Sequence, residues 1–177
     1  MTKDLIEAIE QRHSVRAFED RPVPAATIGR IVDCGRMAPS AGNIQPWEFW
    51  VIRRPDLKAA LARAAYGQDF VATAPVVIVV CAEPGRSASR YGERGSQLYC
   101  LQDTAAAVEN MLLAAVAFGL GACWVGAFDE AEASKALRLP GRLRPVAIIP
   151  VGYPAETDMR PRHRPLRPRE ETIVMVD

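Results

Sequence analysis

Three short polar segments interrupt the apolar stretches of this sequence, and each carries side chains that suit ligand binding. The first, residues 12–16, reads Arg-His-Ser-Val-Arg and places two guanidinium groups and one hydroxyl group close together. Arginine grips phosphate through forked, charge-assisted hydrogen bonds, so this segment suits a phosphate group. The alternative is a cationic helix end, which the helix dipole stabilises without any ligand.

The second segment, residues 39–47, reads Pro-Ser-Ala-Gly-Asn-Ile-Gln-Pro-Trp. Its hydroxyl and amide side chains offer donors and acceptors that suit a planar ring rich in nitrogen and oxygen. The alternative is a tight turn between a helix and a strand, although Asn43 and Gln45 supply more side-chain amide than a turn requires.

The third segment, residues 119–126, reads Gly-Leu-Gly-Ala-Cys-Trp-Val-Gly. Because glycine has no side chain, a ligand can approach the backbone closely at the end of such a strand, where main-chain N–H groups can meet it. The alternative is ordinary core packing, with Trp124 filling space. None of the three segments is decisive alone.

The motifs of several enzyme classes are absent from the sequence. No nucleophile elbow, phosphate-binding P-loop or dinucleotide-binding glycine motif is present. The two histidines, His13 and His163, lie in arginine-rich contexts, and the four cysteines form no Cys-x-x-Cys pair, so no metal site is expected. An enzyme with this sequence is therefore expected to leave its chemistry to a bound cofactor.

Composition and charge narrow the choice of partners. The net charge is +1, which gives the molecule no overall attraction for nucleic acid or anionic membranes. The longest apolar stretch, residues 104–121, contains Glu109 and Asn110 and falls short of a membrane span, and the charged, amphipathic N-terminus is unlike a signal peptide. We therefore expect a cytoplasmic protein that binds neither nucleic acid nor membrane.

The polar segments fall between helices and strands that the hydrophobic periodicity predicts. A run of β-branched residues predicts a strand covered on both faces at 75–82, and an almost wholly apolar stretch predicts a buried central helix at 98–118. Asp129 is expected to cap a helix that runs to residue 139. The other expected helices span residues 3–12, 25–37 and 55–65. The other expected strands span residues 47–53, 123–128, 144–153 and 172–176. Residues 40–46 and 83–95 are expected to be loops. This alternation indicates an α/β or α+β fold.

The sequence closely resembles the nitroreductase-like FMN-dependent oxidoreductases from about Leu5 to Leu166. The resemblance lies in the order of the three polar segments, in the long helix that opens Tyr-Cys-Leu-Gln-Asp-Thr, and in the buried strand that ends in Gly-Tyr-Pro. It implies an α+β sandwich in a single domain over residues 1–177, with a central mixed or antiparallel sheet flanked by helices and a long buried central helix. It also implies a homodimer that holds FMN between its subunits, with a C-terminal arm, about residues 160–177, wrapped around the partner.

The resemblance also implies roles for the polar residues. Arg12, Ser14 and Arg16 resemble contacts to the phosphate and ribityl groups of FMN, with His13 among them. The loop from residue 39 is implied to reach the flavin of the second subunit, and residues 124–126 to run along its isoalloxazine ring. The implied cofactor-binding set is Arg12, His13, Ser14, Arg16, Pro39, Ser40, Asn43, Gln45, Trp124, Val125, Gly126, Arg162 and Arg164, where either of the last two can complete the phosphate site.

The implied activity is a ping-pong reaction. NADH or NADPH reduces FMN, and a small electron-poor acceptor, such as a nitroaromatic or a quinone, then takes the electrons. Flavin N5 is the reactive centre, so no side chain is expected to act as a nucleophile. Two alternatives share the fold: reduction of another small substrate, such as an enal or a halogenated aromatic, and non-catalytic binding of flavin or deazaflavin. Nucleic-acid binding by the arginine-rich arm is a weaker alternative, because prolines interleave its arginines and aromatic residues are lacking.

Overall fold

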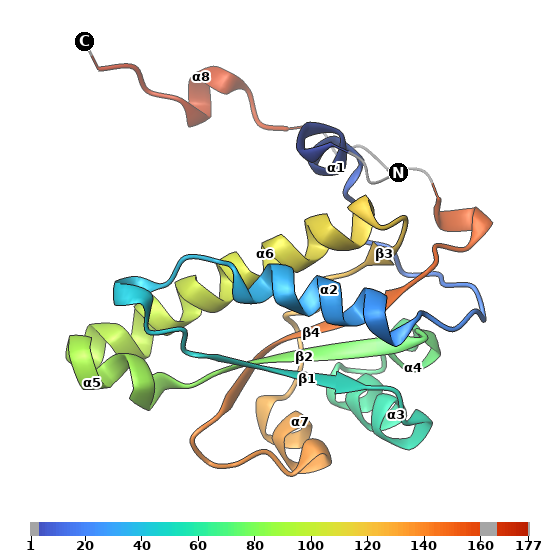
Figure 1. Cartoon of the computed structure of the whole chain (residues 1–177), viewed down its shortest axis with the longest axis horizontal. Helices are drawn as coiled ribbons and strands as arrows, with labels where there is room; N and C mark the ends of the chain where they lie inside the picture. The colour runs from blue at the N-terminus through green and yellow to red at the C-terminus, as the bar shows by residue number, and fades with distance from the viewer. Residues whose placement is uncertain (1–3, 160–165, 177) are drawn as a thin grey trace.

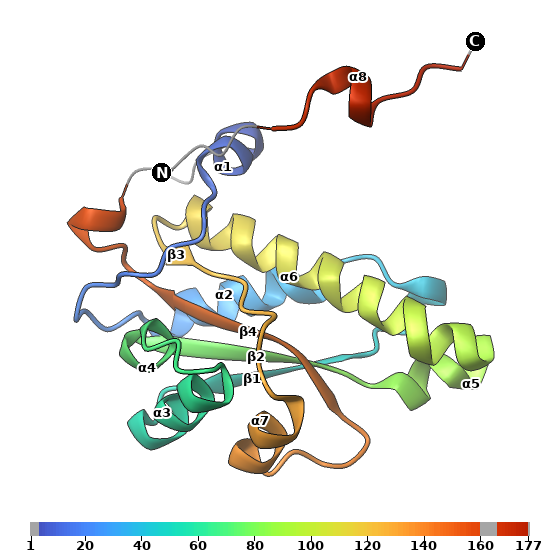
Figure 2. The ribbon, with the colours of Figure 1, turned by 180° about the vertical axis from the view of Figure 1, so that it is seen from behind.

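A four-stranded antiparallel sheet lies at the centre of the molecule (Figure 1 and Figure 2). The computed structural model describes residues 4–159 and 166–176. The strands follow the order β1-β2-β4-β3 across the sheet. They are β1 (Trp47–Ile52), β2 (Val76–Ala82), β3 (Gly121–Ala122) and β4 (Arg144–Gly152). The α-helices are α1 (Leu5–Gln11), α2 (Ala25–Arg36), α3 (Pro55–Ala64), α4 (Phe70–Thr73), α5 (Pro84–Arg94), α6 (Cys100–Ala117), α7 (Glu130–Leu137) and α8 (Arg169–Thr172), and the shorter turns are η1 (Ala41–Asn43), η2 (Gly95–Tyr99) and η3 (Glu156–Asp158).

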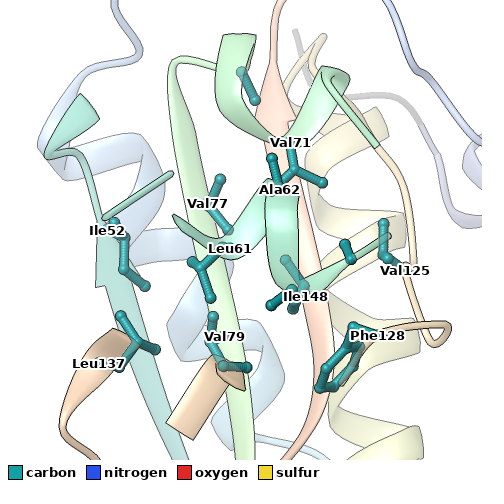
Figure 3. Packing of buried hydrophobic residues seen from close by; sticks show 14 of the residues in the cluster. Ile52, Leu61, Ala62, Val71, Val77, Val79, Val125, Phe128, Leu137 and Ile148 are labelled. Carbon is teal, nitrogen blue, oxygen red and sulfur yellow. The ribbon is translucent and has the colours of Figure 1, made fainter. Parts of the chain in front are cut away.

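Helices cover both faces of the sheet and enclose an apolar core on each side. α3, α4 and α7 lie on one face, whereas α2 and α6 lie on the other (Figure 1 and Figure 2). Side chains of β2 alternate between the two cores, because successive residues of a strand point to opposite faces. Val77 and Val79 belong to the first core, shown in Figure 3, and Ile78 and Val80 belong to the second. Every residue of β2 is buried, which confirms the predicted strand covered on both faces.

The long helix α6 is the main element of the second core. Its buried residues include Val108 and Met111. α2 packs closely against it at Gly35, where an added Cβ would lie 2.8 Å from Cγ of Met111. Asn110 also donates a hydrogen bond of 3.1 Å from Nδ2 to the carbonyl oxygen of Cys34 on α2. The predicted sandwich with a long buried central helix is therefore confirmed.

Two segments between the first and last strands differ from the sequence prediction. Residues 83–95, expected to be a loop, form α5 and the start of the π-helical turn η2, which leads directly into α6. Pro84 in the first turn of α5 suits the helical backbone, whereas the glycines and serines of this segment are typical of loops. The strand expected at 123–128 is reduced to one bridge between Val125 and Ile148, after the two residues of β3.

Apolar side chains are exposed near both ends of the chain. α1 buries only Ala8, and its apolar residues Leu5, Ile6 and Ile9 are exposed. The strand expected at 172–176 is wrong, because after α8 these residues pair with no other strand and are exposed. Figure 1 shows this C-terminal segment extending away from the body. No helix in the part of the chain that the structure describes has the length and hydropathy of a bilayer span.

Candidate functional site

The first and third polar segments lie side by side. α1 ends at Arg12, and the chain then runs parallel to β3, with a bridge between Ser14 and Ala122. The backbone N–H of Val15 donates to the carbonyl oxygen of Ala122 at 3.1 Å. Residues more than one hundred positions apart in the sequence are thus joined by main-chain hydrogen bonding.

Polar side chains of the first segment influence Cys123 in the third. Burial raises the pKa of the Cys123 thiol, while the positive charges of Arg16 and Arg12 and a hydrogen bond with the Ser14 hydroxyl act in the opposite direction. The Asp158 carboxylate acts together with burial, so charges of both signs surround Cys123. Trp124, the next residue, is 40% exposed, so the arginines of the first segment and an exposed aromatic residue lie on neighbouring stretches of the chain. Such an arrangement suits an anionic group attached to a planar ring.

Asp158, which the sequence reasoning missed, shapes the first segment. Its Oδ2 accepts hydrogen bonds from the backbone N–H groups of Arg16 at 2.6 Å and of Ala17 at 3.1 Å. Its carbonyl oxygen lies 2.9 Å from Nε2 of His13, whose Nδ1 lies 3.1 Å from the carbonyl oxygen of Gln11. Both ring nitrogens of His13 are thus turned to the main chain, and the histidine helps to hold the segment in shape. No local motif marks Asp158, because its partners are far away in the sequence.

The second polar segment forms a compact loop. Residues 41–43 make the turn η1, and the Ser40 hydroxyl accepts a hydrogen bond of 3.0 Å from the backbone N–H of Gln45. The Gln45 side-chain amide donates to Oδ1 of Asn43 at 2.9 Å. Gly42, Asn43 and Gln45 have φ angles of 57°, 55° and 54°, a left-handed conformation that costs a non-glycine residue energy. The predicted loop is confirmed, and its side-chain amides bond to each other.

Within one chain, this loop does not join the other two segments. It is attached to the first turn of α6, where the backbone N–H of Ala41 donates to Oδ1 of Asp103 at 3.1 Å. Arg12 contacts the same helix at Glu109, with 3.6 Å between Nε and Oε1. Because an α-helix turns by about 100° per residue, Asp103 and Glu109 lie on different sides of α6. Figure 1 shows the loop at the end of α6 near α5, and the residues after α1 near β3 at the other end.

A hollow opens beside Trp124, between α6 and the start of β4. Its polar wall is an ion pair in which Arg144 donates from Nε and Nη2 to the two carboxylate oxygens of Glu130, each at 2.8 Å. This forked bond lowers the pKa of Glu130. The sequence reasoning missed both residues, since only the packing of α7 against β4 brings them together. The hollow is lined by Leu101, Thr104, Ala105, Val108, Trp124, Glu130, Arg144 and Val146.

Two residues of the predicted cofactor-binding set, Arg162 and Arg164, lie outside the residues that the structure describes. Among the described residues, no cluster of three or more histidine, cysteine or acidic side chains is arranged to hold a metal ion.

Comparison with known proteins identifies the family. The Nitroreductase family matches residues 9–68 and 63–153 of the chain. A protein of Methanothermobacter thermautotrophicus named as an NADH dehydrogenase or NAD(P)H nitroreductase is 34% identical over 163 residues, which cover 86% of this chain and 78% of that protein. The FMN reductase (NADPH) of Bacillus subtilis is 29% identical over 163 residues, which cover 85% of this chain and 66% of that enzyme. The crystal structure of a nitroreductase family protein from Streptococcus pneumoniae superimposes with a TM-score of 0.87 and 26% identity, covering 98% of this chain and all of that chain.

The chain belongs to the Nitroreductase family, and it is an oxidoreductase. The family resemblance predicted from the sequence is confirmed.

Proposed function

We propose that the protein is a flavin enzyme that uses NADH or NADPH to reduce small electron-poor acceptors such as nitroaromatics and quinones, with FMN as its cofactor. The observation that carries this proposal is the main-chain pairing of Ser14 and Val15 with Ala122, which brings the arginine-bearing first segment beside the third. Arg12 and Arg16, the cationic cluster, suit the phosphate of FMN, and the exposed Trp124 suits its ring. The names of the relatives from M. thermautotrophicus and B. subtilis support the same class of cofactor and electron donor.

The donors of the first segment suit the FMN phosphate. The Arg12 side chain is 36% exposed and its ion pair with Glu109 spans 3.6 Å, so this loose pair can give way to a stronger bond with phosphate. Among the described residues, Arg16 donates one side-chain hydrogen bond, of 3.3 Å from Nη1 to the carbonyl oxygen of Ser14, and its guanidinium lies 5.8 Å from the centre of the Phe70 ring. Its other N–H groups suit a ligand. Either Arg162 or Arg164 would add a further cation.

The third segment and the second polar loop would hold the ring from two sides. Residues 124–126 would run along the ring of the FMN whose phosphate is held by the same chain. Pro39, Ser40, Asn43 and Gln45 would reach that ring from the partner subunit. The position of the loop, on a different side of α6 from Arg12, supports a contribution from a second chain.

A homodimer also accounts for the exposed apolar side chains. Leu5 and Ile6 on α1 are 64% and 62% exposed, and Val174 and Val176 after α8 are 83% and 90% exposed. Apolar groups gathered in this way mark protein interfaces more often than free surface. We therefore propose that the arm from about residue 160 wraps around the partner subunit and that α1 lies in the same interface.

Bound FMN would supply the redox chemistry, by accepting hydride from the nicotinamide and passing electrons to the acceptor. The chain's own contribution would be to bind and orient. The cationic cluster would fix the phosphate, Trp124 would lie against the ring, and the hollow bounded by the Glu130–Arg144 pair would adjoin the ring edge.

The visible spectrum of the purified protein tests this proposal. We expect flavin absorption that is bleached by NADPH or NADH without oxygen and restored by a nitroaromatic or a quinone. A yellow protein that neither nucleotide bleaches would favour non-catalytic flavin or deazaflavin binding instead. A colourless protein that does not take up added FMN would overturn the proposal.

A further inference from the structure

Asp103 is the one buried carboxylate among the described residues, with 7% of its surface exposed. It lies in the first turn of α6. Its Oδ1 accepts the hydrogen bond from the backbone N–H of Ala41, and its Oδ2 is buried without any hydrogen-bond partner in the described structure. A buried carboxylate with an unused oxygen is costly, so its presence calls for a role.

The contact with Ala41 completes the end of a helical turn. Ala41 is the first residue of η1, and the first N–H groups of a helical turn have no partner within the turn. Ser40 occupies the N-cap position, but its hydroxyl is bonded to the N–H of Gln45, beyond the turn. The N–H of Ala41, the first residue of the turn, finds its acceptor in Asp103, on another element.

The loop is also held from the opposite side by α5. Arg86 donates from Nε to the carbonyl oxygen of Ile44 at 2.7 Å, and Arg90 donates from Nη1 to that of Gly42 at 3.3 Å. These two arginines are exposed, whereas Asp103 is buried. The hydrogen bond that Asp103 accepts is therefore partly shielded from water, whereas those of the two arginines are exposed, and a shielded hydrogen bond is stronger.

We infer that Asp103 is a positioning residue, whose acceptor oxygen fixes the loop of residues 39–45 in the conformation that meets the flavin of the partner subunit. This inference rests on the proposed function for the flavin, but the anchoring of the loop does not. The role belongs to the acceptor oxygen and not to a negative charge. Burial raises the pKa of Asp103, whereas the hydrogen bond from the N–H of Ala41 acts in the opposite direction.

Two variants of nearly the same shape separate the acceptor from the rest of the side chain. Asp103→Asn keeps an acceptor oxygen and loses the ionisable group, whereas Asp103→Leu loses both. Asp33→Leu, at an exposed carboxylate of α2, is the matched control. Asp103→Ala replaces the leucine variant if that protein is not recovered folded.

Amide hydrogen exchange of the loop is measured first, in FMN-free protein. We expect residues 39–45 to exchange at least about tenfold faster in Asp103→Leu, in line with the loss of one buried hydrogen bond, and within about threefold of the parent in Asp103→Asn. Exchange in β2 should not change, which separates loosening of the loop from global unfolding. Parent-like exchange in Asp103→Leu, or fast exchange in Asp103→Asn, overturns the anchoring role.

FMN affinity is measured second, by titration of the same proteins. We expect Asp103→Leu to bind FMN at least about tenfold more weakly, and Asp103→Asn to stay within about threefold of the parent. A loosened loop with unchanged FMN affinity overturns the link between the loop and the flavin. If the parent protein does not bind FMN, the proposed function fails, whereas the exchange measurement still decides the role of Asp103.

Discussion

Gly121 packs directly against Val15, so closely that a Cβ added at Gly121 would lie 2.5 Å from Cγ2 of Val15. The contact sits where the chain after α1 runs beside β3, next to the hydrogen bond between Val15 and Ala122. Gly121→Ala should therefore push the two segments apart and separate Arg12 and Ser14 from Trp124. We expect a loss of about 1–3 kcal/mol in the free energy of unfolding, typical of overpacking, together with weaker FMN binding.

Urea unfolding and FMN titration check this prediction. Gly141→Ala is the control, because a Cβ at Gly141 meets no atom within 4 Å. A Gly121→Ala protein with the stability and FMN affinity of the Gly141→Ala protein would show that the close contact does not position the site.

Arg12→Ala should weaken FMN binding without unfolding the protein. A hydrogen bond to a charged group is worth about 1.5–3 kcal/mol, so the dissociation constant should rise about tenfold to a hundredfold. The ion pair of Arg12 with Glu109 is long and partly exposed, so its loss should hardly change stability. Fluorescence titration with FMN measures the change. Arg36→Ala, which breaks a surface pair with Asp33 on α2, should leave FMN binding unaltered.

The buried carboxyl group of Asp103 should make stability depend on pH. Burial raises its pKa above the ordinary value of 3.8, so the folded protein binds the proton more tightly than the unfolded chain does. The stabilisation that results is complete below about pH 4 and is lost as the pH rises through the pKa of the folded state. The free energy of unfolding of the parent, minus that of Asp103→Asn, should thus be largest below about pH 4 and decline as the pH rises above that value.

Urea unfolding of FMN-free protein across this pH range measures that difference. Asp33→Asn, which changes an exposed carboxylate, controls for the general effect of removing one acidic group. A difference that stays flat, or that grows with pH, would mean that folding does not raise the pKa of Asp103.

A charge on the outer face of α1 should dissociate the dimer. Ile6 is 62% exposed, so Ile6→Glu costs the isolated chain little but would bury a charge in the proposed interface. We expect a monomer at micromolar concentrations that loses its FMN, as measured by sedimentation and by absorbance. Tyr66→Glu, at another exposed position just after α3, should leave the dimer intact. A dimeric Ile6→Glu protein with full FMN content would place the interface elsewhere.

Much of the fold was predictable because its local patterns are strong. The run of β-branched residues in β2 is typical of a buried strand, and the long apolar stretch of α6 is typical of a buried helix. Asp129 caps α7 as expected, with its side chain accepting from the N–H of Glu132 at 2.9 Å. The polar segments were recognisable because side chains such as Asn43 lie between stretches of apolar residues.

The rest depends on contacts between distant residues, which no local pattern reveals. Asp103 accepts a hydrogen bond from Ala41, and Asp158 accepts one from Arg16, because the fold brings these distant residues together. The helix α5 was missed because its glycines and serines disfavour a helix locally, whereas its arginines bond to carbonyl groups of the loop at 42–44. The exposure of the apolar residues of α1 was not evident either. A helix that packs against its own chain and one that packs against a partner subunit have the same pattern of apolar residues.

Helix α6 connects the parts of the site, through Asp103 to the second polar loop, through Glu109 to Arg12, and through Leu101 to the hollow beside Trp124. Inserting or deleting one residue between positions 101 and 109 would swing one set of contacts by about 100° relative to another. The helix should therefore tolerate substitutions but no change of length. Changes in chain length that leave the site intact should fall outside residues 101–109.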